Sequence, residues 1–125
     1  LLCHGVADDD LRKVWPGTEK MAIERSHLLD NIILDGEFKY LINGHMHFRT
    51  LIHFEALTLI NAGTLRGEHW PGFSVIDFEA KHITAFEFCD GQICLVKTHD
   101  LTQEAHTVWS NTQSFRGGWD PVRLF

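Results

Sequence analysis

The 125-residue sequence predicts an α/β fold, with one helix early in the chain followed by a series of short strands. Two patterns predict it. Residues 18–35 carry apolar side chains at helical spacing, and after Gly36 short apolar runs alternate with turn residues. A hydrophobic fraction of 44% is enough for a real core and argues against disorder. We therefore expect one domain without an internal linker.

The first third of the chain is predicted to contain a strand end, a loop and the helix. Residues 1–3 are typical of the end of a buried strand, too short to be a whole one, so we expect the chain to continue a longer sequence. Residues 5–17 lack periodicity and are predicted as a loop. The helix is predicted for residues 18–35, with Thr18 as its N-cap and Gly36 in the left-handed position after its end. Its predicted core-facing side chains are Met21, Ala22, Leu28, Leu29, Ile32 and Ile33.

The remainder of the chain is predicted to be mostly strands. These strands are residues 38–42, 51–54, 57–60, 73–78, 83–88 and 93–96. A two-residue turn at Asp90-Gly91 would pair Phe88 with Ile93. The same register would pair Phe86 with Leu95, and would place Cys89 opposite Gln92 and Cys94 opposite Glu87. Because residues 73–78 are apolar on both faces, we expect that strand to lie inside a layered structure.

Composition excludes several classes of protein. No apolar run approaches the roughly 18 residues that cross a bilayer, and no signal peptide is recognisable, so we expect a soluble, cytoplasmic protein without a membrane partner. The formal charge of −6 and the lack of a basic block disfavour binding to nucleic acid. Three cysteines without a C-x-x-C pair are expected to be reduced, structural thiols.

Histidines follow two of the predicted strands. Gly44-His45-Met46-His47 comes directly after the strand at residues 38–42, and His4 follows residues 1–3. Both imidazoles of an H-x-H pair can turn inward on a tight loop, and neutral imidazole suits first-row divalent metals. One helix separates the two sites, as in a parallel strand–helix–strand unit, which puts both strand ends at one edge. The polar turn Asn61-Ala62-Gly63-Thr64 ends another strand.

This ordered set of motifs resembles the C-terminal half of the calcineurin-like metallophosphoesterases. It is most similar to the small bacterial members, whose usual motifs are G-H-T-H and N-P-G-S. The resemblance covers residues 1–88. In this sequence Met46 replaces the usual threonine of the first motif, and Ala62 and Thr64 replace the proline and serine of the second. It implies a two-sheet α-β-β-α sandwich, of whose single domain residues 1–125 form the C-terminal portion.

The resemblance also implies a chemistry. Two divalent transition-metal ions (Mn, Fe, Zn or Ni) would be bridged by a hydroxide that attacks the phosphorus of a small phosphoester, with a phosphodiester favoured. His4 and His45 would ligate one ion and His47 the other, and no residue of this chain is assigned as a catalytic acid or base. Residues that shape the rim or bind substrate would be Asn61, Gly63, Thr64 and Arg66, the arginine through bidentate hydrogen bonds to phosphate.

The family's D-x-H, G-D-x-x-D and G-N-H motifs do not occur in the sequence. We therefore expect a missing N-terminal half, or a partner chain, to supply the remaining ligands. The alternative function is a non-catalytic scaffold of the same fold that binds proteins, as in the retromer subunit that resembles these enzymes. The three intact histidines favour the hydrolase, because a scaffold does not require them. A cupin fits poorly, since Glu55 is too far from His47 to be its carboxylate ligand.

The other histidines lack motif context. We expect ordinary structural or surface roles for His53, His69, His82, His99 and His106.

Overall fold

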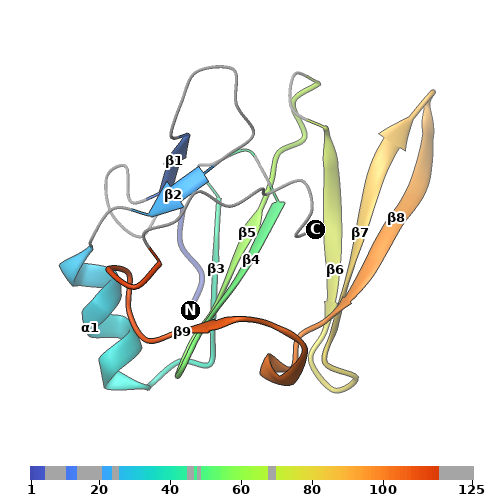
Figure 1. The fold of residues 1–125 in the computed structure, drawn as a ribbon. Coiled ribbons are helices and arrows are strands. Elements are labelled where there is room, and N and C mark those ends of the chain that lie inside the picture. The colour runs from blue at the N-terminus through green and yellow to red at the C-terminus, as the bar shows by residue number, and fades with distance from the viewer. Residues whose placement is uncertain are drawn as a thin grey trace.

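The computed structural model describes residues 1–4, 11–13, 21–23, 26–44, 47, 49–67 and 70–115. The fold is mixed α/β, as predicted, and strands predominate. Figure 1 shows three layers: the helix α1 (His27–Asp35), a four-stranded sheet with the order β3-β5-β4-β9, and a three-stranded sheet with the order β6-β7-β8. We call these the central sheet and the outer sheet.

Helix α1 begins and ends with side-chain and backbone signals that the sequence contains. The Ser26 hydroxyl accepts a hydrogen bond from the Leu29 amide at 3.1 Å, which caps the first turn. Gly36 follows the last turn with a φ of 62°, the left-handed conformation predicted for it. Leu29 and Ile33, one turn apart, are the helix residues buried against the central sheet.

The predicted start of the helix, with Thr18 as its N-cap, is wrong. Strand β2 (Met21–Ile23) pairs with β1 (Leu11–Lys13) in a small antiparallel sheet, so the helix begins nine residues later than residue 18. Strand β1 also lies in the stretch that was predicted to be a loop. Leu28, expected on the buried stripe, is 52% exposed. Local helical spacing around Met21 was overridden by strand pairing, which depends on a partner segment that periodicity does not reveal.

The central sheet contains β3 (Tyr40–Asn43), β4 (Arg49–Phe54), β5 (Thr58–Ala62) and β9 (Val108–Trp109). Strand β3 is parallel to β5, β4 is antiparallel to β5, and β9 is parallel to β4. Leu2 forms a parallel bridge with Ile42 on the free side of β3. Leu2 and β3 are therefore parallel neighbours with α1 between them in sequence, which agrees with the predicted strand–helix–strand order, and the β1–β2 hairpin is an addition to it.

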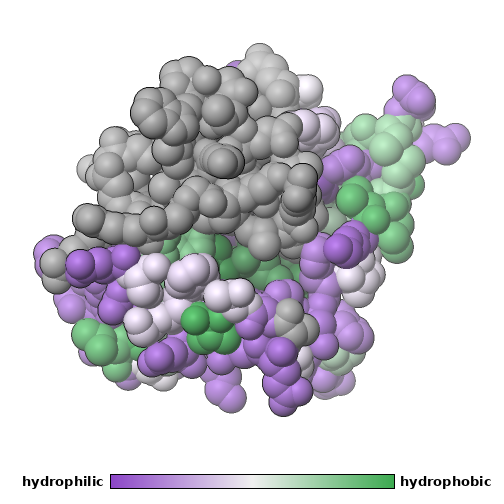
Figure 2. All heavy atoms as spheres, in the orientation of Figure 1, coloured by the Kyte–Doolittle hydropathy of each residue, from purple (hydrophilic) through white to green (hydrophobic). Residues whose placement is uncertain are grey.

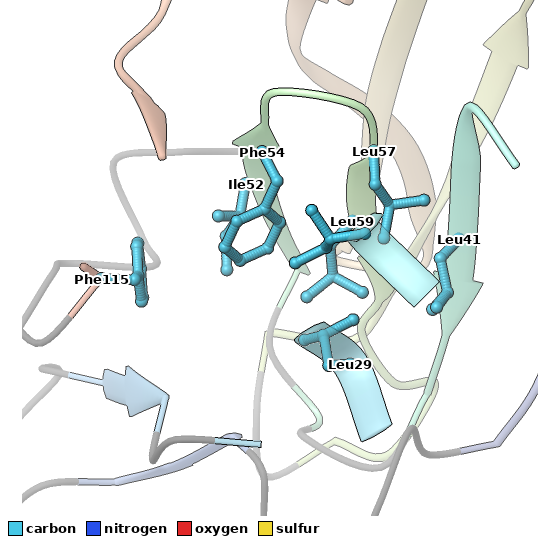
Figure 3. Packing of buried hydrophobic residues seen from close by; sticks show 8 residues of the cluster. Leu29, Leu41, Ile52, Phe54, Leu57, Leu59 and Phe115 are labelled. Atoms are coloured by element: carbon cyan, nitrogen blue, oxygen red, sulfur yellow. The ribbon is translucent and has the colours of Figure 1, made fainter. Parts of the chain in front are cut away.

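An apolar cluster fills the space between α1 and the central sheet (Figure 3). Its buried members are Leu29, Ile33, Leu41, Ile52, Phe54, Leu57, Leu59 and Phe115. Thr112 holds this end of the chain against the helix: its hydroxyl accepts from the Ser26 amide at 3.0 Å, and its own amide donates to Asp30 Oδ1 at 2.8 Å. Segments far apart in sequence thus close one core.

The outer sheet contains β6 (Gly72–Asp77), β7 (His82–Cys89) and β8 (Gln92–Asp100). The hairpin register is as predicted, with Phe88 opposite Ile93 and Phe86 opposite Leu95. Asp90 and Gly91 have φ angles of 48° and 77°, the left-handed pair that a tight hairpin turn requires. A bulge leaves Val96 without a cross-strand partner, since Ala85 faces Lys97.

The two faces of the outer sheet differ. A second core cluster lies between the sheets, formed by Leu51, Ile60, Ile83, Ala85 and Leu101. The opposite face carries the Phe73, Phe86 and Phe88 rings, with Phe73 and Phe86 stacked at 5.1 Å, together with side chains that remain exposed (Figure 2). These exposed side chains are Val75 at 53%, Phe88 at 46%, Ile93 at 60% and Leu95 at 64%. The expectation that residues 73–78 lie inside a layered structure is wrong, because this outer face is uncovered at Val75 of β6.

Arg49 joins the two sheets through a nearly buried ion pair. From β4 of the central sheet its guanidinium pairs with the Glu87 carboxylate of β7, and Nη1 donates to the Phe86 carbonyl at 2.9 Å. Two glycines make room for it. A Cβ on Gly63 would lie 2.6 Å from Arg49 Cγ, and one on Gly72 would lie 2.7 Å from Nη1.

All three cysteines are free thiols. Cys89 faces Gln92 and Cys94 faces Glu87, as predicted. A hydrogen bond with the Cys94 thiol, and to a smaller extent burial, raise the pKa of Cys89 to about 11. In the part of the chain that the structure describes, no helix is long and apolar enough to span a membrane.

We predict that Arg49→Met lowers the free energy of unfolding by about 3 kcal/mol, because it leaves the Glu87 carboxylate and the Phe86 carbonyl without their partner between the sheets. Urea unfolding of the wild type and the variant measures the difference. Arg66→Met is the matched control at an exposed position, where a change within about 0.5 kcal/mol is expected. Equal losses in both variants would show that the inter-sheet pair contributes nothing.

Candidate functional site

Three parallel strand ends meet at one edge of the central sheet. Leu2 pairs with Ile42 of β3, and β3 pairs in register with β5 from Tyr40 opposite Thr58 to Asn43 opposite Asn61. Cys3 donates from its amide to the Ile42 carbonyl at 3.0 Å, and the Gly44 amide donates to the His4 carbonyl at 2.8 Å. His4 and the start of the Gly44–His47 loop are therefore neighbours, as the strand–helix–strand pattern predicted.

His4 lies exposed against Gly44. A Cβ built on Gly44 would be 3.5 Å from His4 Nδ1, an ordinary contact, and the φ of Gly44 is outside the left-handed region. Glycine is thus not required at 44 by strain or by space. Glycine at 44 places no side chain against the His4 ring.

His47, the described residue of the segment that follows Gly44, has a strained backbone. It has a φ of 60°, which an L-residue with a side chain adopts at a cost, and histidine is among the residues that adopt it most often. Its side chain is half-buried. His45 and Met46 lie outside the described residues. The convergence of His4, His45 and His47 therefore stays a prediction. Among the described residues alone, no three His, Cys, Asp or Glu side chains are close enough to hold a metal ion.

Asn61 ties these strand ends together. Its side chain is fully buried, and Nδ2 donates to Asn43 Oδ1 at 3.1 Å and to the Gly44 carbonyl. Its Oδ1 accepts from the Gly63 amide at 3.1 Å. This pattern fixes the orientation of the amide and the backbone at the base of the histidine loop. The sequence analysis named Asn61 but missed Asn43. Both asparagines end a predicted apolar strand, and this shared position is the signal that could have revealed Asn43.

The other predicted rim residues form the turn after β5. Gly63 has a φ of 80° and lies against Arg49. Glycine is therefore required at this position by the backbone conformation and by packing. Thr64 Oγ1 accepts from the Arg66 amide at 3.1 Å, and the Thr64 carbonyl accepts from the Gly72 amide at 3.0 Å. The Thr64 hydroxyl thus serves the turn itself. The Arg66 side chain is exposed.

Comparison of the chain with protein-family models and with curated proteins found no match.

Three histidines lie elsewhere, near the opposite end of β4. His53 is 2% exposed, and its Nδ1 is 2.9 Å from Thr58 Oγ1. Its ring lies over that of His106 with centroids 4.4 Å apart, and His106 Nε2 donates to the Asp100 carbonyl at 2.7 Å. Burial lowers the pKa of His53 to about 4, with His106 adding to this effect and Asp100 opposing it. Burial also lowers the pKa of His99, and Lys97 and His106 act in the same direction.

We predict that Asn61→Ala lowers the free energy of unfolding by about 2–3 kcal/mol, because Asn43 Oδ1, the Gly44 carbonyl and the Gly63 amide lose a buried partner. Amide hydrogen exchange at Gly44 and Gly63 should accelerate. Asn31→Ala, at an exposed position of α1, is the control and should change stability by no more than about 0.5 kcal/mol. Unchanged exchange at Gly44 would show that the asparagine does not hold the loop.

We also predict that acid destabilises the protein through His53. Because its folded pKa of about 4 is below the ordinary value of 6.5, the unfolded state binds a proton first, and stability falls as the pH drops from 6.5 towards 4. The free energy of unfolding should fall by about 3 kcal/mol over this range. Urea unfolding at several pH values measures the change. His53→Gln should flatten this slope, and His82→Gln, at an exposed position, should retain it. A slope that persists in His53→Gln would assign the acid sensitivity to other groups.

Proposed function

We propose that this chain is the histidine-bearing, C-terminal portion of a single-domain phosphoester hydrolase that uses two divalent transition-metal ions and acts on a phosphodiester. The observation that carries the proposal is the hydrogen bond from the Gly44 amide to the His4 carbonyl. It sets Gly44, the residue before the His45-Met46-His47 segment, beside His4 at the edge where parallel strands end. In open α/β sheets this is the edge at which ligands bind.

The donor set fits borderline divalent metals. Imidazole nitrogens suit Mn, Fe, Zn and Ni, and in our proposal His4 and His45 hold one ion and His47 the other. Two such ions, when bound, neutralise the phosphoryl oxygens and activate water for in-line attack on phosphorus. The remaining ligands, carboxylates among them, would come from an N-terminal half or a partner chain with the D-x-H and G-N-H motifs, which this sequence lacks.

Other residues of the chain would position these groups. Asn61 would act from behind the ligands, because it holds the Gly44 carbonyl at the start of the histidine segment. Arg66 follows the Gly63-Thr64 turn and has an exposed guanidinium, which could bind a substrate phosphate by two parallel hydrogen bonds. The formal charge of −6 favours a small phosphoester over a nucleic acid. Free thiols at all three cysteines are consistent with the cytoplasmic location that we propose.

The strained backbone at His47 favours a functional role for this residue. A left-handed φ at a residue other than glycine costs of order 1 kcal/mol, and such positions cluster at functional sites. Glycine would remove this strain but would not supply an imidazole.

A protein-binding scaffold is the second candidate. The apolar outer face of the outer sheet favours it, because exposed contiguous apolar patches often mark interaction sites. In a scaffold the histidines would have no task, so their substitution separates the two candidates.

We predict that His47→Gly in the intact enzyme raises metal-free stability by about 1 kcal/mol through relief of strain, while Mn²⁺ binding weakens and hydrolysis of an aryl phosphodiester falls by a few orders of magnitude. Calorimetric titration with Mn²⁺ measures binding independently of turnover. Excess Mn²⁺ should restore part of the activity by refilling the weakened site.

His82→Gly is the matched control, since His82 is an exposed histidine on β7. It should leave Mn²⁺ binding and turnover unchanged. If His47→Gly binds Mn²⁺ and turns over like the wild type, His47 is a turn residue and the scaffold becomes the better proposal.

A further inference from the structure

Strand β8 has a free edge along the side of the molecule. It pairs with β7, and no described strand lies on its other side. In Figure 1 the β7–β8 hairpin lies on the side away from α1, with β8 outermost. A free edge presents unpaired backbone N–H and C=O groups, so proteins usually protect it with charges, proline or a covering segment. The sequence from Gly91 to Val96 contains neither a charged residue nor a proline, so this part of the edge is open to another strand.

The hairpin register determines which backbone groups of β8 are free. A two-residue turn is flanked by a hydrogen-bonded pair, to which Gln92 belongs, and such pairs alternate with non-hydrogen-bonded ones along the strands. Gln92 and Cys94 therefore direct their N–H and C=O groups to β7, whereas Ile93 and Leu95 direct theirs to the free edge. The side chains of Ile93 and Leu95 are 60% and 64% exposed. The bulge at Val96 ends this regular stretch.

We propose that this edge pairs with the same edge of a second copy of the chain, antiparallel about a two-fold axis at Cys94. Ile93 of each copy then lies opposite Leu95 of the other, and each such pair exchanges backbone hydrogen bonds between groups that are free in the single chain. Both side chains are apolar and lie on the outer face of the sheet, where Phe88 and Val75 are also exposed. A two-fold interface requires such a self-complementary register, because the same pair of residues meets twice.

The charges that flank this stretch favour the same register. Asp90 precedes the uncharged stretch and Lys97 follows it. With Cys94 on the axis, Lys97 of one copy is one residue from the position opposite Asp90 of the other, so an ammonium and a carboxylate are neighbours at each end. An axis at Leu95 instead sets Asp90 opposite Asp100 of the other copy, and like charges directly opposite destabilise a sheet.

Strand β6, at the other edge of the outer sheet, is less suited to such pairing. The Gly72 amide at its start donates to the Thr64 carbonyl at 3.0 Å, so the turn after β5 covers part of that edge. Its last residue is Asp77, and a charge on an edge strand discourages pairing with another chain. The pairing through β8 does not depend on the proposed hydrolase function, since β8 supplies none of the proposed site residues.

The first test is sedimentation of the full chain under reducing conditions over a range of concentrations. Because about five residues pair, we expect a reversible dimer, so the wild type should shift from the mass of one chain to that of two as its concentration rises. Leu95→Lys should raise the dissociation constant of the dimer at least tenfold, because it places two ammonium groups beside the axis.

Val75→Lys is the matched control, because Val75 is exposed on the same face but belongs to β6. It should leave the dissociation constant unchanged. A wild type that is monomeric at every concentration, or a dimer that persists in Leu95→Lys, would overturn the proposal. Loss of the dimer in Val75→Lys as well would assign it to packing of the outer faces and would also overturn pairing through the edge.

A cross-link tests the register. After Cys3→Ser and Cys89→Ser, Cys94 is the one thiol left in the chain. Non-hydrogen-bonded pairs have Cα atoms about 4.5 Å apart, within the range that a disulfide spans. Oxidised glutathione should therefore link two copies through Cys94, taking up the electrons and protons of both thiols as it becomes reduced glutathione. A gel without reducing agent measures the yield.

The control chain carries Gln92→Cys and has all three native cysteines replaced by serine. Gln92 is exposed and lies on the same face of β8 as Cys94. In the proposed register two thiols at position 92 are about 13 Å apart, so this chain should not cross-link. Equal yields from the two chains would overturn the register.

Discussion

The arrangement of this fold depends on one ion pair between its sheets. Arg49 leaves the central sheet, pairs with Glu87 of the outer sheet and occupies space that Gly63 and Gly72 leave open. An arginine placed there must be paired, because an isolated guanidinium in a nearly buried position would be costly. The pair therefore links β4 to β7, while the apolar cluster around Leu51 and Ile83 supplies the burial between the sheets.

The ion pair is connected to the candidate site by contacts of single residues. Arg49 packs on Gly63, the Gly63 amide donates to Asn61, and Asn61 donates to the Gly44 carbonyl beside His4. The site edge is thus supported by groups that are buried and paired, whereas His4 and Arg66 remain exposed. In many proteins, exposed binding residues on loops are positioned in this way by a rigid, buried framework.

Strand β5 relates the two places in the molecule where chemistry concentrates. At its end, Asn61 supports the histidine loop, and at its start, Thr58 holds His53 beneath a pocket beside β9. The first place is polar, with His4 exposed at the sheet edge. The second is lined mostly by apolar and aromatic side chains. The two can be altered independently, because substitutions this far apart without shared partners act additively.

Local sequence determined several features by itself. The turn at Asp90-Gly91, the register of Phe88 with Ile93, the left-handed Gly36 and the strands around the histidine motif follow from residue chemistry and spacing of period two. The ordered motifs, through their family resemblance, led to the hypothesis of a metal site. That hypothesis stays a prediction, because His45 lies outside the described residues. Only tertiary structure decided the rest. Strand β2 formed where helical spacing predicted a helix, the Arg49 bridge and the Asn43–Asn61 pair appeared only on assembly, and His53 acquired its low pKa through burial. These features depend on partners distant in sequence, and no local pattern specifies which distant segment will become the partner.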